Sequence, residues 1–189
     1  MTTYDALLLV SFGGPENPAD VLPFLRNVTR GRGVPEERLA AVAEHYYHFG
    51  GVSPINGWCR SLIDALNQEF TAHDVNLPVY WGNRNWSPML VEAVQRMAGD
   101  GVRRALAFTT SAYGSYSSCR QYLEDLGAAR AAVGASAPAI DKIRHFFDHP
   151  GFVRPFADNL AAALATVPEN VLDSTRILFT AHSISEIMD

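Results

Sequence analysis

The sequence has only two cysteines, Cys59 and Cys119, and no apolar run long enough to cross a bilayer. Two cysteines are too few for a disulfide framework, so free thiols in a reducing cytoplasm are expected. A bilayer span needs about 20 consecutive apolar residues, and the amino terminus lacks the basic and apolar regions of a signal peptide. These absences predict a cytoplasmic protein without membrane insertion.

Basic residues are also scarce relative to acidic ones, and the formal net charge is −5. A nucleic-acid binder would show a basic surplus, so the charge argues against that class. The fingerprint Gly-x-Gly-x-x-Gly is missing after the first predicted strand, which argues against a bound nucleotide. With 48% hydrophobic and 19% charged residues, the 189-residue chain is long enough for one well-packed domain.

Strand-like apolar runs alternate with helical patterns along the whole chain. The expected strands are residues 4–12, 77–82, 104–110, 140–145 and 177–180. The expected helices are residues 17–28, 35–48, 56–72, 87–97, one that ends near 133 and one that follows 150. This alternation predicts an α/β fold with a doubly wound parallel sheet, in which ligands bind outside the carboxyl ends of the strands.

Several loops at these strand ends carry candidate binding residues. Arg30 lies in a basic loop and could hold a carboxylate bidentately, although a solvated basic turn explains the loop equally well. Ser53 follows two glycines that let a ligand approach the backbone, and its hydroxyl can donate a hydrogen bond. His145 and His149 have the spacing of two ligands on a helix, but Pro150 indicates a turn, so no metal site is expected there.

Residues 111–122 are rich in aromatic and hydroxyl side chains, which suit a flat, apolar ligand fringed with carboxylates. A serine-rich capping loop is the alternative. His182 follows the last predicted strand, and a neutral imidazole can bind ferrous iron or accept a proton near neutral pH. A ring that merely bonds to backbone at the end of a core strand is the commoner fate of a single histidine.

Four motifs occur in the order and spacing of ferrochelatases. They are Ser11-Phe-Gly-Gly-Pro, Arg30-Gly-Arg, Gly50-Gly-Val-Ser-Pro-Ile and Thr180-Ala-His-Ser-Ile. Nearly the whole chain resembles the N-terminal half of a ferrochelatase, with its chelatase-like, Rossmann-type fold. Gly82-Asn-Arg-Asn-Trp and residues 29–35 are similar to the actinobacterial type, which acts on coproporphyrin III.

The resemblance implies a lyase of haem biosynthesis that inserts Fe²⁺ into coproporphyrin III to give coprohaem. Iron is then a substrate, no nucleotide is consumed, and a monomer is expected. The implied tetrapyrrole contacts are Phe12, Arg30, His45, Tyr46, Ser53, Tyr116 and Tyr122. His182 would face the centre of the macrocycle, either as ligand of Fe²⁺ or as acceptor of pyrrole protons, and the spacing does not separate these roles.

Three positions depart from or extend the family pattern. Phe12 stands where several relatives have a tyrosine that can ligate iron, and His45 stands where some have an arginine. Cys119 coincides with the isolated N-terminal cysteine of cluster-bearing ferrochelatases. It is the candidate [2Fe-2S] ligand of the complete protein, because two cysteines alone do not supply the four ligands of such a cluster.

We expect residues 1–189 to form the N-terminal chelatase domain, ending just after the histidine strand. The second domain of the family, which supplies a catalytic glutamate, is absent from these residues, so a fragment or a truncated product is expected. One alternative is a half-domain that binds a tetrapyrrole or iron without turnover. Another is a shorter cobalt chelatase of corrinoid synthesis, which the motifs at 50–55 and 83–86 resemble less.

Overall fold

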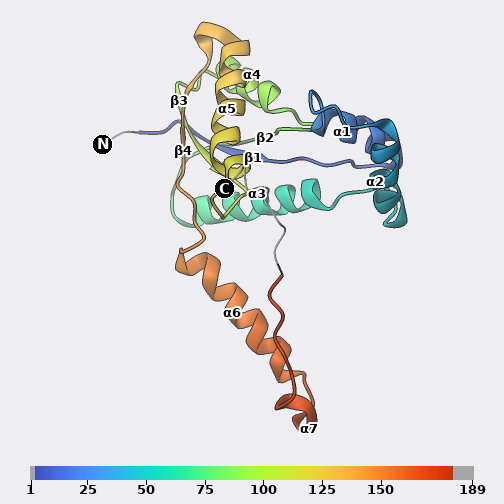
Figure 1. Cartoon of the computed structure of the whole chain (residues 1–189). Coiled ribbons are helices and arrows are strands. Elements are labelled where there is room, and N and C mark those ends of the chain that lie inside the picture. Colours follow the sequence, from blue (N-terminus) through green and yellow to red (C-terminus); the bar gives the residue numbers. More distant parts are fainter. Residues whose placement is uncertain (1–2, 181–189) are drawn as a thin grey trace. The chain divides into compact units, whose positions relative to one another are not determined.

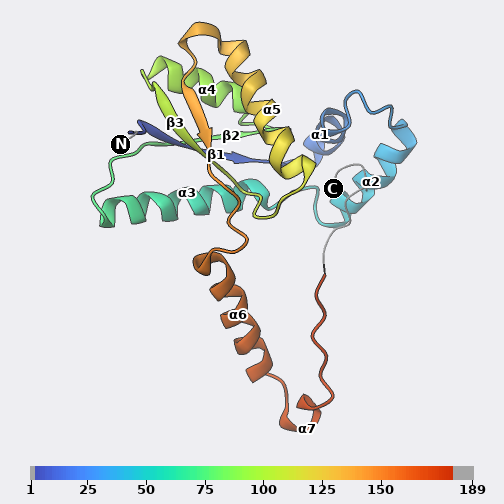
Figure 2. The ribbon, with the colours of Figure 1, turned by 60° about the vertical axis from the view of Figure 1, so that its left-hand side comes forward.

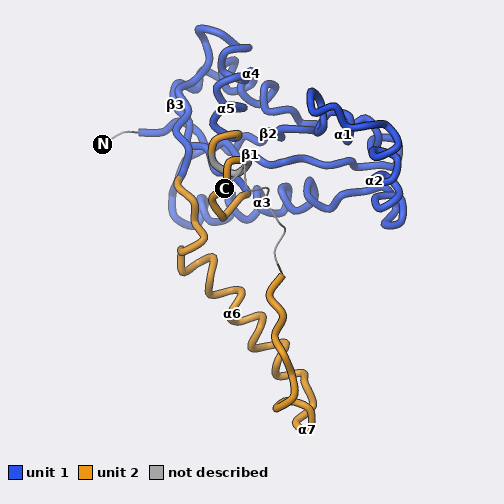
Figure 3. Tube along the Cα trace, in the orientation of Figure 1, with its two compact units in different colours: residues 1–110, 122–143 blue, residues 111–121, 144–189 orange. Residues whose placement is uncertain are grey.

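The computed structural model describes residues 3–180, and for residues 117–119 it describes the backbone alone. The chain forms two compact units (Figure 3). Unit 1 comprises residues 1–110 and 122–143, and unit 2 comprises residues 111–121 and 144–189. The helix α5 (Tyr116–Val133) begins in unit 2 and belongs to unit 1 from Tyr122 onward.

Unit 1 is built on a parallel sheet (Figures 1 and 2). Its strands are β1 (Ala6–Ser11), β2 (Val79–Asn83), β3 (Arg104–Thr109) and β4 (Ala139–Lys142), in the spatial order β2-β1-β3-β4. All residues of the central strand β1 are buried, as expected for a parallel strand covered on both faces. The predicted doubly wound α/β fold is confirmed.

Helices cover both faces of this sheet. Those wholly in unit 1 are η1 (Pro18–Asp20), α1 (Val21–Val28), α2 (Glu36–His48), α3 (Ile55–Ala72), α4 (Leu90–Gly99) and η2 (Gly134–Ser136). α4 and α5 lie on one face and α3 lies on the other (Figures 1 and 2). No helix among the described residues is long and apolar enough to span a membrane.

Alternate side chains of β1 contribute to the main core of unit 1. Leu8 and Val10 are fully buried in a core that includes Val94 and Met97 of α4 and Leu126 of α5. A second, smaller core lies between α1 and α2, and its buried members are Val21, Phe24, Leu25, Leu39 and Ala43. The two helices therefore form a hydrophobic lobe of their own, beyond the carboxyl end of β1 (Figure 1).

One predicted helix start is confirmed, and another is displaced. The side-chain oxygen of Asn17 accepts from the Ala19 N–H at 3.0 Å, with Pro18 in the first position of η1. Residues 87–88 do not cap α4, which begins three residues after Ser87 at Leu90. The carboxylate of Glu92 accepts from the Met89 N–H at 2.9 Å instead, so the acid of the first turn supplies the cap.

Unit 2 contains α6 (Pro150–Ala165) and α7 (Glu169–Leu172). The strand predicted at residues 177–180 is wrong, because these residues form neither helix nor strand. A strand is stable only when a neighbouring strand satisfies its backbone, and the described residues of unit 2 contain no strand. Leu178 and Phe179 are accordingly 85% and 90% exposed.

Two buried asparagines join the loops of unit 1. Asn56 and Asn83 are both fully buried, and the Asn83 Nδ2 donates to Oδ1 of Asn56 at 3.1 Å. Nδ2 of Asn56 donates to the carbonyl oxygens of Gly14 and Ser87, at 3.4 and 3.2 Å. Trp81 Nε1 donates to the remaining amide oxygen, that of Asn83, at 3.0 Å. The pair thus ties α3 to the loops after β1 and β2.

Replacing Asn56 by alanine should destabilise unit 1 by about 1–3 kcal/mol, because it removes two donated hydrogen bonds and leaves buried groups without partners. Urea denaturation followed by circular dichroism would measure the change in the free energy of unfolding. Asn67→Ala, at an exposed position on the same helix, is the matched control and should change this free energy by less than about 0.5 kcal/mol. Equal effects of both substitutions would contradict the role of the network.

Candidate functional site at the carboxyl edge of the sheet

The loops after β1, β2 and β3 lie at the same edge of the sheet, since the strands are parallel. Phe12 follows β1, Arg84 follows β2 and Thr110 follows β3. The chain runs from β1 to β2 on one side and then to β3 on the other, so the topological switch point lies between β1 and β3. Ligands of doubly wound sheets bind outside the strands at such a point.

Two glycines let the loop after β1 pack closely against its neighbours. A Cβ on Gly14 would lie 2.6 Å from Cβ of Ser53, and a Cβ on Gly13, whose φ is +81°, would lie 2.8 Å from Cβ of Asn83. The Ser53 N–H donates to the carbonyl oxygen of Pro15 at 2.8 Å. These contacts hold Ser53 at the carboxyl edge of the sheet.

A first hollow of about 550 Å³, here called the His45 hollow, opens between α2 and the loop that precedes α3. It is lined by His45, Tyr46, Phe49, Val52, Ser53 and Pro54. Phe49 is 79% exposed and offers an aromatic surface. The polar side chains of the lining are those of His45, Tyr46 and Ser53. Three of the predicted tetrapyrrole contacts therefore line one hollow.

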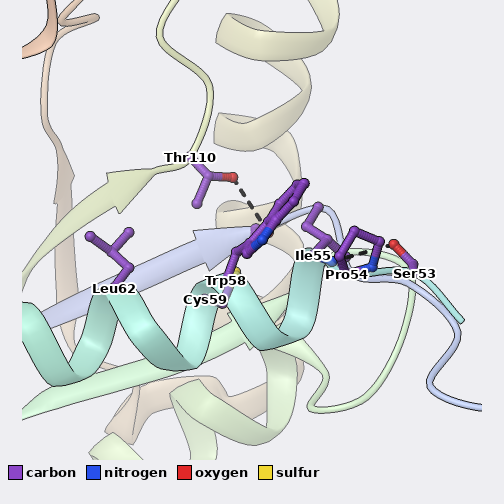
Figure 4. A pocket seen from close by; sticks show the side chains of 8 residues that line it. Ser53, Pro54, Ile55, Trp58, Cys59, Leu62 and Thr110 are labelled. Atoms are coloured by element: carbon purple, nitrogen blue, oxygen red, sulfur yellow. Dashed lines mark hydrogen bonds between the residues drawn. The ribbon is translucent and has the colours of Figure 1, made fainter. Parts of the chain in front are cut away.

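A second hollow of about 520 Å³, here called the Trp58 hollow, shares Ser53 and Pro54 with the first. Trp58, Cys59 and Leu62 project into it from α3, and Thr110 faces them from the end of β3 (Figure 4). The remaining lining residues are Ser11, Ser53, Pro54 and Ile55. The two hollows together extend along the switch-point edge.

The Trp58 hollow contains the free thiol of Cys59, which is 3% exposed. Burial raises the pKa of this thiol, and the Ser11 hydroxyl and the Arg60 charge only partly oppose that effect. The neutral thiol is a poor nucleophile and metal ligand, because both roles require the thiolate. Cys59 is thus a packing residue, and its prediction as a free thiol is confirmed.

An aromatic cluster connects the loop after β1 with the hydrophobic lobe. The Phe24 ring makes edge-to-face contacts with Phe12, Tyr46 and Trp86, at centroid distances of 6.2, 6.1 and 6.1 Å. Burial raises the pKa of Tyr46, so its hydroxyl stays protonated. The sequence reading missed Phe24, although its place next to Leu25 on the apolar face of α1 was a usable signal.

The described residues place the remaining predicted contacts in different surroundings. Arg30 is exposed in the turn after α1 and lines neither hollow. Tyr116 is 41% exposed and lies in unit 2. Tyr122 is only 4% exposed, and the guanidinium of Arg84 lies over its ring at 4.6 Å. His182 lies outside the described residues, and so does the side chain of Cys119.

Among the described side chains, those of residues 3–116 and 120–180, no three His, Cys, Asp or Glu groups gather as a metal site would require. His145 and His149, the described histidines of unit 2, have structural contacts. The Nδ1 of His149 accepts from the Gly151 N–H at 3.1 Å and caps α6, while the His145 Nδ1 lies 3.4 Å from the Ser111 carbonyl oxygen. The turn predicted before Pro150 is confirmed.

A family model described as ferrochelatase matches residues 4–189. The chain belongs to the ferrochelatase family. Family membership agrees with the position of the candidate site. Ser11 and Ser53, which belong to two of the motifs that resemble the family, both line the Trp58 hollow.

Individual relatives support the same assignment. The coproporphyrin III ferrochelatase of Streptomyces coelicolor is 58% identical over 184 residues, which is 96% of this chain and 49% of that protein. The proteins of the same name from Mycolicibacterium smegmatis and Nocardia farcinica are 59% and 56% identical, over 96% and 98% of this chain and 54% and 53% of theirs. The chain thus spans about half the length of these relatives.

Proposed function

We propose that this chain supplies the tetrapyrrole-binding half of an enzyme that inserts Fe²⁺ into coproporphyrin III to give coprohaem. The observation that carries the proposal is the lining of the His45 hollow by His45, Tyr46 and Ser53, in a chain of the ferrochelatase family. Relatives at 56–59% identity bear the name coproporphyrin III ferrochelatase. Haem synthesis is therefore the pathway in which the activity would act.

The residues of the hollow suit the parts of such a ligand. Phe49 and Tyr46 present rings to a flat macrocycle, and Phe12, 38% exposed, presents another at the end of β1. The Ser53 oxygen accepts from the Ile55 N–H at 3.4 Å, which leaves its O–H to donate to a propionate. The exposed guanidinium of Arg30 can hold a carboxylate bidentately.

Metal insertion replaces two pyrrole protons by one Fe²⁺ without a change of oxidation state, so two protons must leave the macrocycle. In the proposed mechanism, the neutral imidazole of His182 accepts one proton while the other passes to water, or it passes the iron to the ring nitrogens while both protons pass to water. The proposed tetrapyrrole contacts other than Tyr116 belong to unit 1, whereas this chemistry depends on a residue of unit 2. A chain that binds a tetrapyrrole without turnover is the second candidate, because both hollows lie wholly in unit 1.

A full-length protein that carries this sequence should insert Fe²⁺ into coproporphyrin III in preference to protoporphyrin IX. The reason is the basic and polar segment from Arg26 to Arg38, which suits a porphyrin with four carboxylates. Arg30 and Arg32 are exposed there, and Arg26 forms an ion pair with Glu36 at 2.9 Å. Anaerobic assays with both porphyrins would measure the preference, and a clear preference for protoporphyrin would contradict it. Porphyrin binding by the 189-residue chain without insertion by the full-length protein would favour the second candidate.

His182→Ala in the full-length protein should lower the rate of iron insertion by about 10²–10⁴-fold, the usual contribution of a positioned proton acceptor. Porphyrin binding should be retained, because the described residues that line the two hollows belong to unit 1 and remain unchanged. Single-turnover absorbance would measure the rate, and fluorescence titration would measure binding. Full activity of the variant would refute the assignment, and His149→Ala is the matched control, since His149 only caps α6.

We also propose that the full-length protein carries a [2Fe-2S] cluster with Cys119 as one ligand. Cluster-bearing ferrochelatases have an isolated cysteine that Cys119 matches in sequence, and three further ligands must come from outside these 189 residues. Cys119→Ser should therefore abolish the visible absorption and the bound iron of anaerobically purified protein, whereas Cys59→Ser, which changes a buried thiol of unit 1, should preserve them. Equal cluster content in all three proteins would show that Cys119 is no ligand.

A further inference from the structure

Arg84 is a buried cation among the residues of the candidate site. Its side chain is 6% exposed, although arginine is rarely buried without a partner. The guanidinium forms an ion pair with Asp125 of α5, whose side chain is 35% exposed. It also lies over the Tyr122 ring at 4.6 Å and near the Phe12 ring at 5.9 Å. One side chain therefore contacts two of the predicted tetrapyrrole contacts.

The backbone around Arg84 fixes the same two loops. The Arg84 N–H donates to the carbonyl oxygen of Ser11 at 3.0 Å. The Asn85 N–H and Nδ2 both donate to the carbonyl oxygen of Phe12, at 3.1 and 3.2 Å. Asn27 Nδ2 in turn donates to the Asn85 carbonyl oxygen at 2.7 Å and connects the loop to α1. The loop after β2 therefore fixes the backbone at Phe12, and the orientation of the Phe12 ring depends on further contacts.

Among the described residues, two contacts orient the Phe12 ring. Phe24 meets it edge to face on one side, at 6.2 Å between centroids, and the Arg84 guanidinium is the cation near it. The guanidinium in turn is oriented by Asp125 and by the Tyr122 ring. Burial raises the pKa of Tyr122, and the Arg84 charge opposes this effect without cancelling it. The phenol stays neutral, so the guanidinium stacks on an uncharged ring.

We propose that Arg84 is a positioning residue, which holds the Phe12 ring in the orientation that packs against the bound tetrapyrrole. The inference rests on the proposed function. Arg84 acts through Phe12 rather than by touching the substrate, since its side chain is almost fully buried and its charge is matched by Asp125. Asp125 and Tyr122 belong to the same device, because they fix the plane of the guanidinium.

A lysine at position 84 cannot reproduce all contacts of the Arg84 side chain. An ammonium group can keep the ion pair with Asp125, but it lacks the planar surface that stacks on an aromatic ring. Cation–π contacts of this kind contribute enough to change a binding constant by about tenfold when they are lost. Arg84→Lys should therefore raise the dissociation constant of coproporphyrin III by roughly tenfold.

The test uses the full-length protein, with fluorescence titration of coproporphyrin III and thermal unfolding for each variant. Arg104→Lys is the matched control, because Arg104 pairs with Asp141 at 2.6 Å at the beginning of β3, at the opposite edge of the sheet. The control should bind coproporphyrin as the wild type does. If Arg84→Lys binds coproporphyrin III with the dissociation constant of the wild type, the inference is overturned. The proposed function would still be supported by the activity of the wild type.

A double-mutant cycle distinguishes positioning from general stability. If Arg84 acts through the Phe12 ring, Phe12→Leu and the pair Phe12→Leu/Arg84→Lys should bind coproporphyrin equally weakly. Additive losses would show that Arg84 acts elsewhere and would overturn the inference. Failure of the wild type to bind the porphyrin at all would instead reject the proposed function, and this inference with it.

A second variant covers the case in which Arg84→Lys does not fold. Arg84→Met/Asp125→Leu removes both charges together, so no unpaired charge stays buried and folding is retained. It also removes the cation from Phe12 and should weaken coproporphyrin binding roughly as Arg84→Lys does. Wild-type affinity in this folded variant would overturn the inference independently of the first.

Discussion

The hydrogen bond between the Asn56 and Asn83 amides is the contact on which the carboxyl edge of unit 1 depends. It joins α3 to the end of β2 in a region without solvent, and the same two amides hold the carbonyl groups of Gly14 and Ser87. Buried amides of this kind must be satisfied, because an unpaired polar group costs more than the hydrogen bond gains. The positions of Ser53 and of both hollows follow from this junction, since Gly14 packs directly on Ser53.

The layered fold could be predicted because its signals are local. The run before Ser11 is apolar at nearly every position, and the glycines after it end the strand, so both the parallel sheet and its first turn were correct. The strand predicted at residues 177–180 is wrong, because apolar and β-branched residues favour a strand but do not form one alone. Pairing requires a neighbouring strand, and the described part of unit 2 contains none. The predicted cap of α4 was wrong for a different reason. More than one residue near a helix end can cap it, and here the Glu92 carboxylate, rather than Ser87, accepts a hydrogen bond at the start of the helix.

The site was only partly accessible from sequence. The resemblance to ferrochelatases implied His45, Tyr46 and Ser53 as contacts, and all three line one hollow. Arg84 was not given a role, because its importance lies in contacts across long sequence separations, such as that between Arg84 and Asp125. No periodicity or spacing encodes such a pair.

The burial of Tyr122 changes how its predicted role should be understood. A ring that is 4% exposed within unit 1 and covered by a guanidinium has little surface to offer a macrocycle. Its hydroxyl lies among Arg84 and Thr110, and the Thr110 hydroxyl donates to the Ser11 oxygen at 3.4 Å in the Trp58 hollow. Tyr122 therefore connects α5 with Thr110 after β3 and with the Arg84 side chain after β2. His182, proposed for iron insertion, and Cys119, proposed for the cluster, belong to unit 2, whereas the described lining of both hollows belongs to unit 1.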